Sequence, residues 1–396
     1  MNVSTQPQGS LAIPFDHQRL DRLMDEAGID VIVATSKHNV QYLLGGHRAD
    51  FFDVMDATGV TRYLPVMVYA KGAPEKAAYT GHRLEKFQTQ NNPPWTPETQ
   101  TVSSGSVDAM EKAVAHMAKA GVRPKRIAVE FGFLPYDAAN VLRAAFPDAD
   151  WVDALFPLER LRARKTAAEL AKLKIASEAV LASMQAVIEG HGAGASKNDI
   201  VDALRIEEVK RGLTFEYCLI TAGTSLNRAP SDQKLAQGDI MSIDSGGNYK
   251  GYIGDICRMA ILGEPDAELV DMLGEIELIQ RAAMKPIKAG VMGREIYGAG
   301  EPLRAKSKFQ KLDFLAHGMG MVSHEAPRLA KHGPVPYPNE YADMPLEAGM
   351  VVSVETTLLH DRRGFIKLED TVVVTETGHE IYGEGLRGWN RVGPKI

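Results

Sequence analysis

The sequence predicts a protein of two domains, an α/β domain over residues 1–157 and an α+β domain over residues 158–396. Three observations predict this organisation. The length of 396 residues suits two domains of ordinary size. Short helix and strand signals alternate in the first third of the chain, which is typical of an α/β domain. Beyond residue 157, two long helical patterns are separated by strand-rich segments, and this order indicates an α+β domain.

The spacing of apolar residues places the elements. A helical spacing predicts helices, and short apolar runs bounded by turn residues predict buried strands. In the first domain we expect helices near 20–27, 110–121 and 136–145 and strands at 30–34 and 127–129. In the second domain we expect helices at 166–189 and 266–288 and strands within 214–222, 239–262 and 349–376. We expect the basic stretch 157–165 to connect the two domains as a linker.

Composition excludes several classes of protein. The 45 basic and 51 acidic residues give a formal charge of 45 − 51 = −6, so we expect no nucleic-acid partner. No apolar run approaches the roughly 20 residues that a membrane-spanning helix requires, and the first residues lack a signal-peptide pattern. Cys218 and Cys257 are too few for a disulfide framework. These features favour a cytoplasmic protein with no membrane partner.

Two aspartates lie in neighbouring strand-like segments. Asp244 follows the apolar run Ile240–Ile243, and Asp255 comes 11 residues later, beyond the turn-forming residues 248–251. A hairpin would bring the two carboxylates together. Burying two carboxylates side by side costs several kcal/mol unless a cation or protons compensate. A surface hairpin with scattered acidic residues is the simpler alternative.

Two histidines lie in a glycine-rich segment. His317 and His324 are seven residues apart, and Gly318 and Gly320 follow the first of them. Glycine allows the backbone to approach a ligand closely. A lone histidine is more often structural than a ligand, and the pair makes a ligand role more credible. A nucleotide-binding loop is disfavoured, because no third glycine or helix start follows.

Two glutamates occur within apolar strand patterns, although glutamate is depleted in strands. Glu355 ends the run Val351–Val354, and Glu369 stands inside the run from Phe365 to Val374. A polar edge position or a salt bridge would also explain each of them.

Together, four carboxylates and one imidazole occupy apolar contexts. Oxygen-rich ligation with one nitrogen suits divalent manganese, iron, cobalt or zinc. The four carboxylates carry a charge of −4, which two divalent cations balance. Such a two-metal site can hold a bridging hydroxide and polarise a carbonyl. The predicted ligands are Asp244, Asp255, His317, Glu355 and Glu369.

The order Asp, Asp, His, Glu, Glu resembles the pita-bread metallopeptidase superfamily, which includes aminopeptidase P, prolidase and the metal-free creatinase. The resemblance covers most of residues 160–396, and residues 1–157 resemble the creatinase/prolidase N-terminal domain. It implies a pita-bread catalytic domain that cleaves an amide bond with a metal-bridging hydroxide. By the same resemblance, Asp255 and Glu369 bridge two metals, Asp244 holds one of them, and His317 and Glu355 hold the other. It further implies that Glu355 shuttles a proton.

The resemblance also implies that His324 contacts the substrate or stabilises the developing oxyanion. Several other positions depart from the family pattern. Thr356 and Thr357 replace the usual Pro-Gly after the first glutamate, and Lys367 replaces an arginine two residues before the second. Arg228 stands at or near a position where relatives carry histidine. We expect these changes to affect substrate binding, with Arg228 clamping an anionic group, and to leave the metal ligands untouched.

Four functions follow from these observations. The first is an Xaa-Pro dipeptidase or aminopeptidase, and the second, nearly equal, is a hydrolase of a small non-peptide C–N compound, as in creatinase or ectoine hydrolase. The third is a metal-dependent lyase like the one that acts on dimethylsulfoniopropionate, and the last is a non-catalytic binding protein. By analogy we expect a homodimer, in which the segment Gly45–Phe51 reaches the neighbouring pocket.

Overall fold

The computed structural model describes residues 12–49, 63–330 and 339–394. The chain forms two compact units, residues 1–161 and 162–396, and the sequence had placed the domain boundary at residue 157. The first unit is an α/β structure and the second an α+β structure, so both predicted fold classes are confirmed. None of the helices in the described part of the chain has the length and apolar character that a membrane crossing requires.

The first unit contains a mixed six-stranded sheet in the order β4-β3-β2-β1-β5-β6. Apolar side chains from alternate positions of β1 enter two separate hydrophobic clusters, one with α1 and α2 and one with α4 and α5. The helices are α1 (His17–Glu26), α2 (Lys37–Leu43), α3 (Lys86–Asn91), α4 (Ser106–Lys119), α5 (Tyr136–Ala145) and α6 (Leu155–Arg162). The strands are β1 (Val31–Ala34), β2 (Val66–Ala70), β3 (Ala78–His82), β4 (Glu98–Ser103), β5 (Arg126–Val129) and β6 (Asp150–Asp153).

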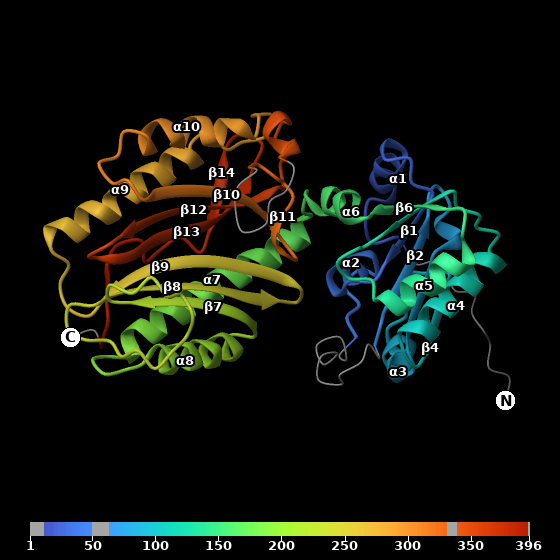
Figure 1. The fold of residues 1–396 in the computed structure, drawn as a ribbon, viewed down its shortest axis with the longest axis horizontal. Coiled ribbons are helices and arrows are strands. Elements are labelled where there is room, and N and C mark those ends of the chain that lie inside the picture. The colour runs from blue at the N-terminus through green and yellow to red at the C-terminus, as the bar shows by residue number, and fades with distance from the viewer. Residues whose placement is uncertain (1–11, 50–62, 331–338, 395–396) are drawn as a thin grey trace. The chain divides into compact units, whose positions relative to one another are not determined.

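The second unit contains a nine-stranded sheet whose main path is β11-β10-β12-β13-β9-β8-β7 (Figure 1). Helices α7 and α8 lie against β7 to β9, and α9 and α10 lie against β10, β12 and β13. The helices are α7 (Ala167–Gly190), α8 (Lys197–Lys210), α9 (Ala267–Met284) and α10 (Arg294–Arg304). The strands are β7 (Thr214–Ala222), β8 (Ile240–Tyr249), β9 (Tyr252–Ile261), β10 (Leu312–Met319), β11 (Ser323–Glu325), β12 (Val351–His360), β13 (Gly364–Val374), β14 (His379–Tyr382) and β15 (Asn390–Arg391).

The two faces of this sheet have different chemistry. On β12, Val352, Val354 and Leu358 pack in the hydrophobic cluster with α9, and successive strand residues point to opposite faces. The alternate residues, including Glu355, therefore lie on the face away from that helix. The same alternation applies to β13, where Leu368 is in the cluster and Glu369 is not. One face of the sheet is thus buried by helices, and the other is available for a polar site.

Every predicted helix and strand corresponds to an element of the structure, and the errors are elements that were missed. The predicted strand regions correspond to β7, to β8 and β9, and to β12 and β13. Strand β10 was not predicted, because its apolar alternation runs directly into Gly318-Met319-Gly320 and resembles a loop. Helices α8 and α10 were also missed.

The basic stretch 157–165, which we expected to connect the two domains, contains the boundary between the two units, and part of it is buried. Its first part lies in α6, and the side chains of Arg162 and Lys165 are buried. Both bind the carboxylate of Glu325, at 2.9 Å from Arg162 Nη2 and 3.0 Å from Lys165 Nζ. Glu325 directly follows His324, so this buried ion cluster fixes β11 at the edge of the site. A charged sequence alone cannot reveal that its charges are paired in the interior.

Candidate metal centre

Four adjacent strands, β8, β9, β13 and β12, position the predicted carboxylates. Asp244 lies opposite Cys257 in the β8–β9 pair, and Asp255 lies opposite Gly246. The two aspartates are therefore diagonal neighbours on one face, rather than directly opposed. Glu355 and Glu369 lie directly opposite each other in the β12–β13 pair. The hairpin register therefore places all four carboxylates on the polar face.

Packing against Tyr217 requires a glycine at position 246. A Cβ atom at this position would lie 2.4 Å from Cε1 of Tyr217, far inside a normal contact. The Tyr217 ring, which comes from β7, lies over the glycine and lines the cavity in front of the carboxylates. The predicted Asp-Ser-Gly motif thus combines a polar ligand with the space for its aromatic neighbour.

Gly318 has a packing role that the sequence did not predict. A Cβ atom there would lie 2.3 Å from the backbone of Ala326, so this glycine lets β10 and the residues after β11 pass closely. The expected approach of a ligand to this backbone stays a prediction, and the structure adds this packing reason for the glycine. The close approach serves the chain itself, and it places His317 and His324 against each other.

The polar face opens into a cavity of about 340 Å³. Its walls combine acidic, basic and aromatic side chains, and they come from six strands and the segment between β7 and β8. The lining residues are Tyr217, Leu219, Arg228, Asp244, Asp255, Ser323, His324, Glu355, Lys367 and Glu369. His317 lies behind this surface and is buried.

Three of the predicted ligands form a compact donor set. Candidate ligand atoms of Asp255, His317 and Glu369 all lie within 4.8 Å of one another. The Nδ1–H of His317 donates to the carbonyl oxygen of Gly318 at 3.2 Å, so Nε2 faces Oε1 of Glu369, 3.4 Å away, and is the nitrogen that could bind a cation. Oδ1 of Asp255 is buried without a hydrogen-bond partner among the described residues. Two carboxylates and an imidazole, with one carboxylate oxygen unsatisfied, fit a divalent cation.

Lys367 contacts the remaining carboxylates. Its Nζ atom lies 2.8 Å from Oδ2 of Asp244 and 2.7 Å from Oε2 of Glu369, and it also pairs with Oε2 of Glu355. The guanidinium of Arg228 pairs with the same Oδ2 of Asp244. The expected role of these two basic residues in substrate binding stays a prediction, and the structure adds contacts of both with the predicted ligands. Both bind a predicted metal ligand directly.

The buried charges shift one another's protonation equilibria. Burial raises the pKa of Asp244 to about 6, against the opposing effect of Lys367. Burial and the negative charge of Glu369 raise the pKa of Asp255 well above its usual value. Burial disfavours the ammonium of Lys367, but the charges of Asp244, Glu355 and Glu369 outweigh it and raise the pKa of Lys367. The site is thus a set of strongly coupled charges removed from water.

His324 has a strained and distinctive environment. It has a φ of 62°, which is uncommon for a residue other than glycine. Its ring stacks on that of His317 with centroids 3.8 Å apart. Burial and the neighbouring His317 lower the pKa of His324 to about 3, so its imidazole is neutral near pH 7. A neutral imidazole in the cavity wall can accept or donate a hydrogen bond.

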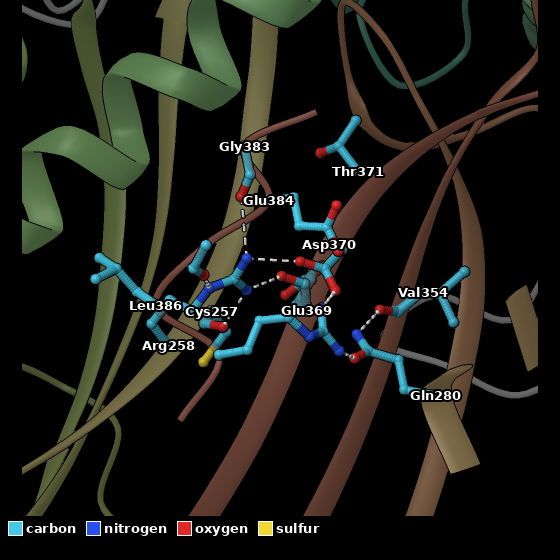
Figure 2. Close-up of polar contacts among 12 residues, drawn as sticks. Cys257, Arg258, Gln280, Val354, Glu369, Asp370, Thr371, Gly383, Glu384 and Leu386 are labelled. Carbon is cyan, nitrogen blue, oxygen red and sulfur yellow. Dashed lines mark hydrogen bonds and ion pairs between the residues drawn. The ribbon is translucent and has the colours of Figure 1, made fainter. Parts of the chain in front are cut away.

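A buried arginine network supports the site from behind (Figure 2). Arg258 is fully buried, and its guanidinium donates to Asp370 Oδ1 at 2.6 Å and to the carbonyl oxygen of Glu369 at 2.7 Å. It also donates to the carbonyl oxygens of Cys257, Gly383 and Gly385. Arg258 therefore ties β9, β13 and the C-terminal segment together at Glu369.

The same network reaches β12. Arg387 pairs with Asp370 and with Oε1 of Gln280, and the amide of Gln280 donates to the carbonyl oxygen of Val354 at 2.7 Å (Figure 2). Val354 directly precedes Glu355, and Asp370 directly follows Glu369. The network therefore fixes the backbone at both Glu355 and Glu369.

The structure brings together every predicted site residue except the two threonines. Thr357 lines a second cavity of about 450 Å³, which also touches Arg228 and Glu355. Thr356 faces the other side of β12 and is fully buried. Sequence reasoning missed Tyr217 and Ser323, whose hydroxyl donates to Oδ2 of Asp255 at 3.0 Å. The alternation of the predicted strand 214–222 contained a usable signal for Tyr217 but none for Ser323.

Comparison with known families agrees with this geometry. The profile described as metallopeptidase family M24 matches residues 171–376, which is just over half of the chain. The profile of the creatinase/prolidase N-terminal domain matches residues 17–164. The chain is 22% identical over 372 residues to an Xaa-Pro dipeptidase of Pyrococcus horikoshii, covering 91% of this chain and 94% of that protein. It is 26% identical over 371 residues to a probable dipeptidase of Mycobacterium tuberculosis, covering 89% of each.

Solved structures share the fold. An Xaa-Pro dipeptidase from Bacillus anthracis has a TM-score of 0.78 at 23% identity, covering 94% of this chain and 98% of that one. The prolidase from Pyrococcus horikoshii has a TM-score of 0.75 at 20% identity, covering 93% and 97%. The second unit therefore has the pita-bread fold that the motif resemblance implied, and the first unit has the creatinase/prolidase N-terminal fold.

Proposed function

The chain belongs to metallopeptidase family M24, a family of hydrolases, and from this membership we propose that it is a divalent-metal-dependent hydrolase of amide (C–N) bonds. One observation carries the proposal. The donor atoms of Asp255, His317 and Glu369 converge within 4.8 Å at the base of a cavity of about 340 Å³. We propose manganese, cobalt, iron or zinc as the metal. The bound metal would supply an activated water at neutral pH and polarise the substrate carbonyl.

We propose the following roles for the residues around it. Of the ligands that the sequence predicts, Asp255, His317 and Glu369 form the convergent donor set, and Asp244 and Glu355 lie beside them. The carboxylate of Glu355 faces the cavity and takes a proton from water and returns it to the leaving amine. The neutral imidazole of His324 donates a hydrogen bond to the oxygen of the scissile carbonyl as negative charge develops there.

The size of the cavity and the guanidinium of Arg228 favour a small substrate that carries a carboxylate. A volume of about 340 Å³ is small among ligand pockets and suits a dipeptide. Arg228 lies between this cavity and the adjoining one and can bind a substrate carboxylate. We therefore propose an Xaa-Pro dipeptide as the substrate class.

A second candidate is a small non-peptide C–N compound. The specific observation in its favour is that Arg228 and Thr357 line the adjoining cavity of about 450 Å³, where the residues differ from the family pattern. A changed lining of this kind alters which substrate fits and leaves the metal chemistry in place.

A substrate panel with the Mn²⁺-loaded protein tests the proposal. Release of free proline from Ala-Pro and Gly-Pro supports the dipeptidase. Turnover only of cyclic or guanidino-type amides supports the second candidate. Release of an unsaturated acid without hydrolysis would indicate a lyase and contradict both. Activity that is undiminished after complete chelation would contradict metal dependence.

The cytoplasmic location and the homodimer are also proposals. Cys218 and Cys257 are both buried and unpaired, which agrees with a reducing compartment. The segment Gly45–Phe51, which we expected to reach a partner's pocket, ends at residues 50 and 51 outside the described part of the chain. Light scattering on the purified protein tests the dimer, and a monomer at micromolar concentration would contradict it.

A further inference from the structure

We infer that Lys367 is a built-in cation that takes the place of one of the two metals expected from the ligand set. The centre then binds a single divalent ion, held by Asp255, His317 and Glu369. This inference rests on the proposed metal-dependent function and deepens it.

The ammonium group of Lys367 lies where three carboxylates of the site converge. Nζ of Lys367 lies within hydrogen-bond distance of Asp244 Oδ2 and Glu369 Oε2, at 2.8 and 2.7 Å, and pairs with Glu355 Oε2. The side chain is only 6% exposed. A cation in contact with three convergent carboxylates satisfies the electrostatic demand that a metal would otherwise satisfy.

The strand register determines on which face of the sheet the Lys367 side chain lies. Lys367 and Glu369 are two residues apart on β13 and share a face, and Lys367 lies opposite Thr357 on β12. Its side chain therefore starts on the ligand face of the sheet. The aliphatic part is enclosed, and the ammonium has few polar alternatives to these carboxylates.

Arg228 adds a second positive charge to the site. Asp244, Asp255, Glu355 and Glu369 contribute −4, and Lys367 and Arg228 contribute +2, which leaves −2. One divalent ion balances this remainder, whereas two leave the buried site with excess positive charge. Since Arg228 and Lys367 both bind Oδ2 of Asp244, that carboxylate is already compensated.

The donor atoms that converge on one point also indicate a single metal ion. Among the described residues, the three-residue set of Asp255, His317 and Glu369 is the group whose donors converge for a metal, and Asp255 Oδ1 is buried without a hydrogen-bond partner. Neither Asp244 nor Glu355 belongs to this set, and Oδ2 of Asp244 and Oε2 of Glu355 both pair with Lys367.

Titration with Mn²⁺ alone tests the inference. Metal-free protein is titrated by calorimetry, and bound manganese is counted after dialysis by elemental analysis. We expect one Mn²⁺ per chain for the wild type. We expect two for Lys367→Met, which keeps the length of the side chain and removes its charge. Lys174→Met is the matched control, since Lys174 makes an exposed ion pair with Glu380, and it should bind one.

The outcomes separate this inference from the proposed function. Two Mn²⁺ per wild-type chain would overturn the inference and leave the proposed hydrolase standing. No bound Mn²⁺ would overturn both. The wild-type count requires no variant, so it decides the matter even where Lys367→Met fails to fold. Anomalous scattering from a Mn²⁺-soaked crystal should give one peak beside His317, and a second peak beside Asp244 would contradict the inference.

Discussion

Replacing Arg258 with methionine should destabilise the catalytic unit strongly. The change keeps most of the side-chain volume and removes a buried guanidinium that donates to Asp370 and to four backbone carbonyls. Asp370 keeps its ion pair with Arg387, so its charge is only partly compensated. Four buried carbonyls left without a donor cost about 1 kcal/mol each. Breaking a buried ion pair costs about 3–5 kcal/mol. Since Arg387 still compensates Asp370 in part and the carbonyls can relax toward other donors, we expect the free energy of unfolding to fall by about 4 kcal/mol.

Urea unfolding followed by circular dichroism and by tryptophan fluorescence measures this change. Trp389 reports on the catalytic unit because its indole donates to the carbonyl oxygen of Leu269 at 3.0 Å. Arg391→Met is the control, since Arg391 forms a solvent-exposed pair with Glu264 and its loss should leave the free energy of unfolding nearly unchanged. Equal effects of the two substitutions would refute the assignment of Arg258 as the buried tie between β9 and β13.

Three further predictions concern single residues. Burial raises the pKa of Glu208 from 4.5 to about 7, so the folded chain holds a proton that the unfolded chain has lost, and stability should fall as pH rises from 4.5 to 7. Glu208→Gln should remove this loss and add up to about 3 kcal/mol at pH 8 but little at pH 4.5; a parallel shift at both pH values in thermal unfolding would contradict the cause. His324→Asn should lower kcat about 100-fold with unchanged Mn²⁺ content, and unaltered steady-state kinetics would exclude its role at the carbonyl. Gly246→Ala should displace the Tyr217 ring and cost about 1–3 kcal/mol in urea unfolding, whereas the control Gly274→Ala, in helix α9 where a Cβ meets nothing, should stabilise by about 1 kcal/mol.

The strands and their polar positions could be predicted because period-2 alternation is a local property of sequence. Asp244, Glu355 and Glu369 each interrupt an apolar run, and this anomaly by itself indicates a buried polar site. The hairpin between β8 and β9 followed from the turn residues at 248–251. The diagonal arrangement of Asp244 and Asp255 could not be predicted, because it depends on how the two strands pair along their whole length.

The contacts of basic residues could not be predicted. Lys367 and Arg228 were expected to face substrate, and whether a long side chain turns toward solvent or toward a neighbouring carboxylate depends on residues from other strands. The burial of Arg162 and Lys165 was not predicted either, because their partner Glu325 lies about 160 residues away. Sequence patterns report the face on which a residue lies, whereas its partner across the fold requires the tertiary structure.

The proposed function requires that Asp255, His317 and Glu369 bind a divalent metal that supports hydrolysis. Calorimetric titration of Mn²⁺ into metal-free wild-type protein and into His317→Ala tests it most directly, because the histidine supplies the nitrogen of the donor set. We predict clear binding to the wild type and loss of measurable binding in the variant. Equal affinity and stoichiometry in the two proteins would contradict the claim.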